Sequence, residues 1–228
     1  MSARAARLLA VPFVLLACAL RFAEDLWLQT LTWGIEPGWA GLLVAFAVLG
    51  VTLGAPLAGY LLVTRQARKR PAAWEISPDG RRFVAGSSPA GMGASAVIIG
   101  WMAGGLVPTE RVPGEDQKRI AELGAFTTVM TVLAVLVLVF ALWLVVGRWP
   151  WLEPDREAVT IKRLIRVTRT PWDEVPADLR EIKVPGGGLH IAPKFLGFTL
   201  QTYQTDPARR DAIGTESEAA RLAHDHQP

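Results

Sequence analysis

The stretch Ala125–Val146 (AFTTVMTVLAVLVLVFALWLVV) decides the fold, because it runs for 22 residues without a charged side chain. About 20 apolar residues are enough for a helix to cross the hydrocarbon core of a bilayer. A buried helix of a soluble protein is the alternative, but no part of the chain is a soluble domain large enough to surround it. The sequence therefore predicts a membrane-spanning helix over about 123–146.

The composition of the whole chain agrees with a membrane protein. Residues of the set AVILMFWYC make up 51% of the 228 residues, and charged residues make up 20%. Soluble globular chains average about 25% charged residues, and here the apolar residues cluster before Val146. This argues against a soluble single-domain enzyme and against disorder over most of the chain.

Two further apolar segments precede this helix. Trp39–Val63 carries no charge over 25 residues, which is long enough to span a bilayer with some tilt. Pro56 lies inside it, and a proline is tolerated there when neighbouring helices satisfy the freed carbonyl. Residues 88–107 are less apolar and rich in glycine, which suits a helix packed against other helices. A re-entrant loop is the alternative for 88–107.

The first apolar segment has two interpretations. Leu8–Leu20 is only 13 residues long and follows Arg4 and Arg7, while Ala17-Cys18-Ala19 fits a small-residue cleavage site. These are the features of a secretory signal peptide. Apolar character resumes over residues 22–27, which favours an uncleaved helix over about 6–28.

The charges between the segments predict the orientation. The 64–87 connector carries six basic residues against two acidic ones, whereas the other two connectors are acidic or balanced. Lys and Arg are retained on the cytoplasmic side. We therefore expect this connector and both chain termini to be cytoplasmic, in a bacterial plasma membrane. Arginine supplies 19 of the 24 basic residues, which indicates a high-GC bacterium.

Small residues offer candidate packing faces. Membrane helices associate by close packing, and small residues let two backbones approach. Two rows at four-residue spacing occur in neighbouring segments: Gly50, Gly54 and Ala58, then Ala96, Gly100 and Gly104. We expect these two faces to meet.

From residue 148 onward the sequence is polar and predicts a small sheet. Residues 157–162 alternate between apolar and polar side chains, which is the periodicity of a strand. A second strand is expected over 167–175, where Pro171 predicts an edge position or a bend. Further elements follow in chain order: short strands over 179–184 and 189–192, and a helix over 193–203.

The run Val159–Leu164 (VTIKRL), followed by Thr170–Val175 (TPWDEV), resembles the opening hairpin of bacterial PH-like domains. The ending Tyr203–Glu218 is similar to the tail of actinobacterial membrane proteins that carry such domains. The resemblance covers roughly 150–221 and implies a small β-sheet capped by a C-terminal helix. About 55 residues separate Trp151 from Asp206, too few for the complete barrel of that family. Either the sheet is shortened, or the strand–turn–strand pattern of Trp74–Val84 adds a hairpin to it.

We therefore expect an α-helical membrane protein with four transmembrane helices and a small cytoplasmic PH-like sheet with a C-terminal helix. The membrane domain covers 1–147, with helices over about 6–28, 39–63, 88–107 and 123–146. The PH-like domain covers 148–206, and 207–228 form a polar, partly disordered tail.

The predicted hairpin carries a candidate membrane-surface contact. Basic side chains surround an aliphatic pair there: Lys162, Arg163, Leu164, Ile165, Arg166 and Arg169. Each basic residue near an anionic leaflet contributes about 1 kcal/mol. The Lys/Arg-x-Arg pattern of lipid-binding PH domains is absent, and a solvated strand face is the alternative.

The remaining sequence offers no catalytic or metal-binding constellation. Cys18 is the single cysteine, His224 and His226 lie in the polar ending, and the net charge of +3 is too small to indicate nucleic acid. We expect a protein without enzymatic activity that presents a PH-like module for protein or membrane-surface interaction. Its expected partners are the lipid bilayer and a protein partner or second copy, with no cofactor. The alternative is a subunit of a transport or cell-envelope assembly complex, which the lack of charges deep in the last three segments weakens.

Overall fold

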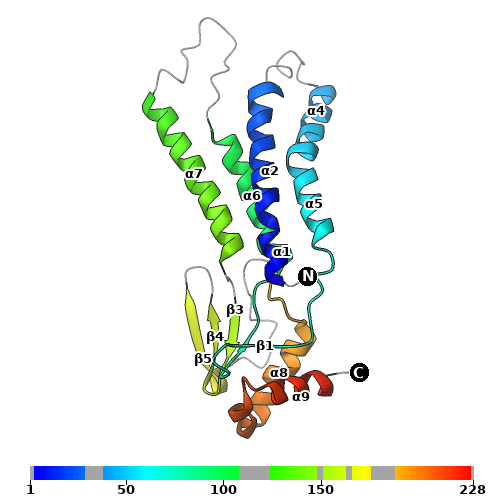
Figure 1. Cartoon of the computed structure of the whole chain (residues 1–228), viewed down its shortest axis with the longest axis vertical. Helices are drawn as coiled ribbons and strands as arrows, with labels where there is room; N and C mark the ends of the chain where they lie inside the picture. The colour runs from blue at the N-terminus through cyan, green and yellow to red at the C-terminus, as the bar shows by residue number, and fades with distance from the viewer. Residues whose placement is uncertain are drawn as a thin grey trace, which may run out of the picture. The chain divides into compact units, whose positions relative to one another are not determined.

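The computed structural model describes residues 3–28, 38–107, 124–147, 151–162, 166–175 and 188–226. The chain divides into two compact units. A helical unit combines Arg4–Arg65 with Gly93–Gly147, and a mixed unit combines Gln66–Met92 with Arg148–Pro228. Each unit is thus assembled from segments that are far apart in the sequence (Figure 1).

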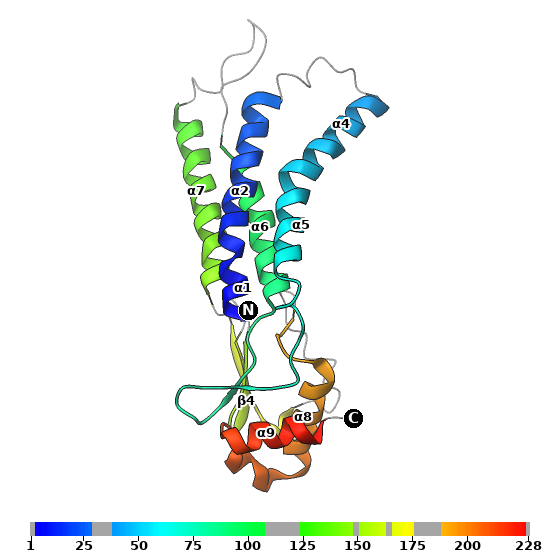
Figure 2. The same cartoon turned by 45° about the vertical axis from the view of Figure 1, so that its right-hand side comes forward.

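The helical unit contains long helices that run side by side (Figures 1 and 2). In chain order its helices are α1 (Ala3–Leu8), α2 (Ala10–Ala23), α4 (Trp39–Leu49), α5 (Ala55–Val63), α6 (Pro89–Gly105) and α7 (Gly124–Val146). Two π-helical turns continue them, η1 (Glu24–Leu28) after α2 and η2 (Gly50–Gly54) between α4 and α5.

Among the described residues, three helices are long and apolar enough to cross a membrane. They are Ala3–Trp27, Trp39–Val63 and Gly124–Val146, and each coincides with a predicted span. Their outward side chains are large and apolar, such as Phe46, Leu62 and Val129, which are 69%, 70% and 62% exposed. Such surfaces are compatible with hydrocarbon as the solvent. The helix expected over 88–107 is also present, as α6.

The helical core is centred on α2. Val14 and Ala17 of α2 are buried with Tyr60 of α5, Val97 of α6 and Val145 of α7. Small residues of α6 permit its close approach to α2. A Cβ at Gly100 would lie 2.6 Å from Val14 Cγ1, and one at Gly104 would collide with the Cys18 carbonyl.

The two rows of small residues therefore do not face each other. The α6 row packs on α2, whereas Gly50 has nothing within 4 Å of its missing Cβ and Ala58 is exposed. The α4–α5 helix meets α6 through larger side chains instead. Tyr60 covers Gly93, and Trp101 Nε1 donates to Thr52 Oγ1 at 3.1 Å. The expected pairing is wrong because these side chains occupy the interface.

The mixed unit contains an antiparallel sheet of order β3-β4-β5, formed by β3 (Trp151–Pro154), β4 (Ala158–Lys162) and β5 (Val167–Pro171). The strand expected over 157–162 is confirmed as β4. The second strand is confirmed only as far as Pro171, because the chain turns there into the 3₁₀ helix η4 (Trp172–Glu174). The sequence did not predict β3.

The connector after α5 forms a small sheet of its own next to this one. Its hairpin consists of β1 (Glu75–Ile76) and β2 (Phe83–Val84). The next residue, Ala85, pairs with Leu152 of β3 through two backbone hydrogen bonds of 2.9 and 3.0 Å. The hairpin expected over Trp74–Val84 is thereby confirmed, and a backbone bridge joins the connector to the C-terminal sheet.

The expected strand over 189–192 is wrong, since only an isolated bridge joins Leu189 to Ser87. The chain from Gly188 to His190 is tied to the connector by Ser88 N to Gly188 O (3.0 Å) and His190 N to Gly86 O (2.7 Å). The strand expected over 179–184 lies outside the described residues.

Residues 207–226 are ordered, unlike the expected tail. After α8 (Pro193–Thr205) come the 3₁₀ helix η6 (Pro207–Ala212) and α9 (Glu216–Asp225). Ile213 and Leu222 are 1% and 0% exposed, so this mostly polar segment buries apolar side chains. One core collects side chains from the connector and from the C-terminal region, including Trp74, Phe83, Leu152, Trp172, Phe195, Tyr203 and Leu222.

Candidate functional site

The predicted membrane-contact residues are only partly described, and two of them are already paired. Lys162 Nζ lies 3.2 Å from Glu153 Oε2 and 4.8 Å from the ring centroid of Trp151. Arg169 Nη2 lies 2.8 Å from Glu157 Oε2 and 3.4 Å from Asp155 Oδ2.

Of the other residues in the predicted set, one is described. Arg166 is exposed, whereas Arg163, Leu164 and Ile165 lie outside the described residues. Since local acids neutralise Lys162 and Arg169, these two side chains are poorly placed to bind an anionic surface.

A charged groove of about 600 Å³ lies on the mixed unit. It is lined by Asp79, Arg81, Arg82, Asp155, Arg156, Glu157 and Arg169. These residues come from the β1–β2 turn, the β3–β4 turn and β5. The groove therefore joins the connector to the C-terminal sheet on one polar surface.

The carboxylates of the groove hold its two turns. Asp155 Oδ1 accepts from the amides of Glu157 and Ala158, both at 2.8 Å. Asp79 accepts from Arg82 Nη2 at 2.7 Å and from the Arg81 amide at 3.2 Å. The Arg82 hydrogen bond and then the Arg81 amide lower the pKa of Asp79 to about 2. Acids that are occupied in this way suit a structural role rather than proton transfer.

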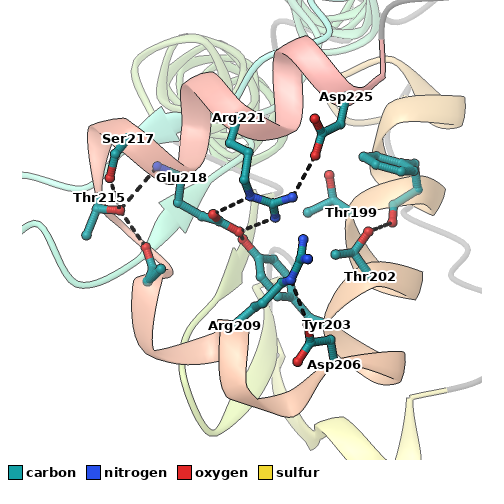
Figure 3. Close-up of polar contacts among 12 residues, drawn as sticks. Thr199, Thr202, Tyr203, Asp206, Arg209, Thr215, Ser217, Glu218, Arg221 and Asp225 are labelled. Carbon is teal, nitrogen blue, oxygen red and sulfur yellow. Dashed lines mark hydrogen bonds and ion pairs between the residues drawn. The ribbon is translucent and has the colours of Figure 1, made fainter.

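A buried polar cluster fixes α9 onto α8 (Figure 3). Glu218 is 7% exposed. Its two oxygens accept from Arg221 Nε and Nη2 at 2.7 and 2.6 Å, and Oε1 also accepts from Tyr203 Oη at 3.1 Å. Arg221 Nη1 donates in addition to Asp225 at 2.6 Å.

The electrostatics of this cluster follow from its geometry. Burial opposes the charge of Glu218, but hydrogen bonds from Arg221 and Tyr203 outweigh it and lower the pKa of Glu218. Burial and then the Glu218 charge raise the pKa of Tyr203. The sequence analysis missed this cluster, although Thr215-x-x-Glu218 is the spacing of a helix-capping box and could have located α9.

A third charged feature lies in the connector directly after α5. Arg68, Lys69 and Arg70 follow one another, and no acidic residue occurs between Thr64 and Trp74. Lys69 and Arg70 are exposed and Arg68 is half-buried. Among the described residues, none of the three forms an ion pair with a carboxylate, unlike Lys162 and Arg169. The sequence analysis used these residues only to predict orientation.

The helical unit has one polar cluster of its own. Arg21 pairs with Glu24 at 2.5 Å and with Asp25 at 3.3 Å. Its guanidinium carbon lies 5.0 Å from the ring centroid of Trp101, which in turn donates to Thr52. Polar side chains thus connect α2, α6 and η2.

Within the described ranges, no group of three or more His, Cys, Asp or Glu side chains could hold a metal ion. No protein-family model matches the chain, and it matches neither a curated protein nor a solved structure. The proposals below therefore rest on the residues themselves.

Proposed function

We propose that the chain is an integral protein of a bacterial plasma membrane that crosses the bilayer four times. Both termini and the mixed unit are cytoplasmic, and the mixed unit is a PH-like interaction module without catalytic activity. One observation carries this proposal: the connector 66–92 and the C-terminal region share one core and are joined by the backbone bridge between Ala85 and Leu152.

This backbone pairing supports an even number of membrane crossings between residues 85 and 152. Ala85 and Leu152 are hydrogen-bonded neighbours, so residues 85 and 152 must lie on the same side of the membrane. Among the described residues between them, α6 and α7 are the helices that could cross. Since α7 is long enough to span, this pairing supports a second crossing by α6.

The length of α6 is compatible with a crossing. It contains 17 residues, and at 1.5 Å per residue this is about 25 Å, near the lower limit for a spanning helix. A helix of this length packed on α2 through Gly100 and Gly104 needs little lipid contact of its own. This arrangement favours a span over a re-entrant loop.

A contact within the helical unit supports the proposed side for the N-terminus. Arg7 Nη1 donates to the carbonyl of Gly147 at 3.4 Å, so α1 starts at the end of the bundle where α7 stops. The mixed unit resumes directly after Gly147. The six basic residues of the 64–87 connector then favour the cytoplasm for this side.

The interaction role rests on the surface of the mixed unit. Its antiparallel sheet with C-terminal helices is the arrangement that the PH-like resemblance implies. Its polar groups are engaged in turns and ion pairs rather than in an acid–base pair around a cavity. Such a surface suits recognition of a partner.

Cysteine labelling tests the topology. In a Cys18→Ala background, single cysteines at Glu75→Cys, Ala220→Cys and Glu115→Cys are treated with a membrane-impermeant maleimide. We expect residues 75 and 220 to react only in broken cells and residue 115 to react in intact cells. Reaction of 75 and 220 from opposite sides would overturn the proposal.

The second candidate function is a subunit of a transport complex, which the Arg21–Trp101–Thr52 contacts favour. Ionisable side chains within membrane helices commonly mark ion or substrate pathways. Purified protein in proteoliposomes with a pH-sensitive dye discriminates the two functions. Flux that is lost in Arg21→Gln supports transport, and no flux from the wild type supports the interaction module.

A further inference from the structure

We propose that Arg68, Lys69 and Arg70 form a binding site for the phosphate groups of anionic lipids at the membrane surface. The proposal rests on the four-span topology proposed above, and it names the membrane as the contact of this part of the mixed unit. The proposed site differs from the hairpin around residues 162–169 that the sequence first indicated.

The boundary between hydrocarbon and headgroups falls just before these residues. Leu62 and Val63 end α5 and are 70% and 55% exposed, which suits contact with lipid tails. The Thr64 hydroxyl donates to the Tyr60 carbonyl at 2.7 Å, so its polar group is satisfied within the helix. Charged side chains begin with the next residue, Arg65.

Chain connectivity keeps the three basic residues close to this boundary. Arg68 to Arg70 follow Val63 by five to seven residues. The backbone does not extend fully over this distance, because Arg65 N bonds to Leu62 O at 3.2 Å and Lys69 N to Gln66 O at 3.4 Å. The headgroup layer is itself about 5–8 Å thick on each side. The three side chains therefore lie within reach of lipid phosphates if α5 ends at this boundary.

The segment is held in place on the mixed unit. Ala67 is 7% exposed, and the Ala192 amide donates to the Pro71 carbonyl at 2.9 Å. Arg70 Nη2 lies 3.1 Å from the position that a Cβ of Gly188 would occupy. The three charges thus belong to a folded turn, which lowers the entropy that binding must offset.

Among the described residues, no carboxylate pairs with these three side chains, unlike Lys162 and Arg169 of the predicted hairpin. Lys162 and Arg169 each contact carboxylates, and the groove arginines share their surface with three acids. In the connector, no acid occurs until Glu75, and Arg68 Nε has no hydrogen-bond partner among the described residues. Arginine and lysine bind phosphate oxygens through charge-assisted hydrogen bonds, so anionic lipid supplies the missing counter-charge.

The test measures lipid binding to the full chain. Delipidated protein in a neutral detergent is titrated with phosphatidylglycerol or phosphatidylcholine, and bound lipid is counted by native mass spectrometry. The variant R68Q/K69Q/R70Q removes the three charges. The matched control R156Q/R166Q/R169Q removes three charges from elsewhere in the same unit. The variant R68K/R70K keeps the charge of the site.

We expect the wild type to prefer phosphatidylglycerol and the site variant to bind it at least tenfold more weakly, since each basic residue contributes about 1 kcal/mol at an anionic surface. The control and R68K/R70K should retain the preference. Equal loss in the control, or no lipid preference in the wild type, would overturn the site. Loss of a co-purifying protein instead of lipid would overturn it too and assign the turn to a protein partner.

The topology labelling at residues 75, 115 and 220 separates the two proposals. Correct topology without a lipid preference rejects only the headgroup site. Residues 75 and 220 on opposite sides of the membrane reject the four-span arrangement on which the site depends.

Discussion

Glu218 shows how a single buried charge can determine whether a helix docks. Its carboxylate is the common acceptor for Arg221 and Tyr203. Glu218→Gln keeps the shape but leaves the Arg221 guanidinium without its main counter-charge. We expect this change to destabilise the docking of α9 by about 2 kcal/mol, as for a hydrogen bond to a charged group. Hydrogen exchange of peptides covering 213–226 measures it.

Glu218 also makes the stability of α9 docking depend on pH. Because the folded pKa of Glu218 is lowered, its stabilising contribution is complete above the unfolded pKa of about 4.3 and is lost as the pH falls through the folded value. Protection of α9 should thus weaken on acidification in the wild type and change less in Glu218→Gln. The control Glu216→Gln, on the exposed first turn of α9, should behave like the wild type. An equal effect of both substitutions would contradict the role of Glu218.

At Gly214 the C-terminal region approaches the connector closely. Its φ is +92°, and a Cβ there would lie 2.5 Å from Arg82 N and 2.6 Å from the carbonyl carbon of Arg81. Gly80 also has a positive φ, of +63°, but has nothing within 4 Å. Substitutions at Gly80 and Gly214 therefore distinguish the effect of backbone strain from that of steric collision.

We expect Gly80→Ala to cost about 1 kcal/mol through strain alone. Gly214→Ala should cost about 1–3 kcal/mol more, because backbone atoms cannot move aside as a side chain can. Thermal unfolding and hydrogen exchange measure the difference. Exchange should rise in both 75–84 and 216–225 for Gly214→Ala, but only near the turn for Gly80→Ala. Equal effects would show that the connector does not press on Gly214.

Among the helices and strands, the sequence predicted those whose pattern of apolar and polar residues follows from their surroundings. The span Gly124–Val146 is continuous because hydrocarbon tolerates no charge, and β4 alternates because one face is buried. By contrast, β3 has only four residues, WLEP, and buries Glu153. That acid is compensated by Arg82 and Lys162 from two other segments, which no local pattern shows.

The sequence predicted that small residues allow close helix packing, but it did not predict which helices pack together. Both rows of small residues carry the same spacing, yet only the α6 row is covered, since Val14 and Cys18 of α2 fill the space above Gly100 and Gly104. Spacing identifies a face that could be approached. Which helix approaches it depends on the larger side chains around it, here Tyr60 and Trp101.

A matched pair of substitutions tests this assignment. Gly100→Ala places a Cβ 2.6 Å from Val14 Cγ1 and 2.9 Å from the Val14 carbonyl oxygen, whereas Gly50→Ala meets nothing within 4 Å. We expect Gly100→Ala to destabilise the helical unit by about 1–3 kcal/mol through overpacking and Gly50→Ala to have no such effect. Thermal unfolding of the purified protein in detergent compares them. Greater sensitivity at Gly50 would restore the pairing that the sequence first suggested.

For the whole molecule, the sequence offered the joining of two separated segments in one unit only as one of two alternatives. The local pattern of Trp74–Val84 predicted a hairpin. The next residue, Ala85, pairs with Leu152, which lies 67 residues further along the chain. Pairing over such a separation is decided by side chains that meet only in the folded state, such as Trp74 Nε1 donating to Thr199 at 3.2 Å. The candidate lipid site has the same origin, because ion pairs in the folded unit engage Lys162 and Arg169 but not Arg68, Lys69 and Arg70.

The discontinuous unit makes a prediction about which fragments fold. A fragment of residues 148–228 lacks Trp74, Phe83 and Ala85, which are 6%, 0% and 3% exposed in the complete core. It should therefore expose apolar surface and give poorly dispersed amide NMR signals. Joining residues 66–92 to its N-terminus through a Gly/Ser linker should restore the pairing of Ala85 with Leu152 and a dispersed spectrum.

Phe83→Ala in the fused fragment is the control for that experiment. Phe83 stacks on Trp74 with ring centroids 5.7 Å apart, and truncating a buried phenylalanine costs about 3–5 kcal/mol. The fusion should then unfold while the linker and the charge stay the same, which ties folding to the connector's side chains rather than to added length. A well-dispersed spectrum from residues 148–228 alone would contradict the shared core, and with it the requirement that α6 and α7 return the chain to the same face of the membrane.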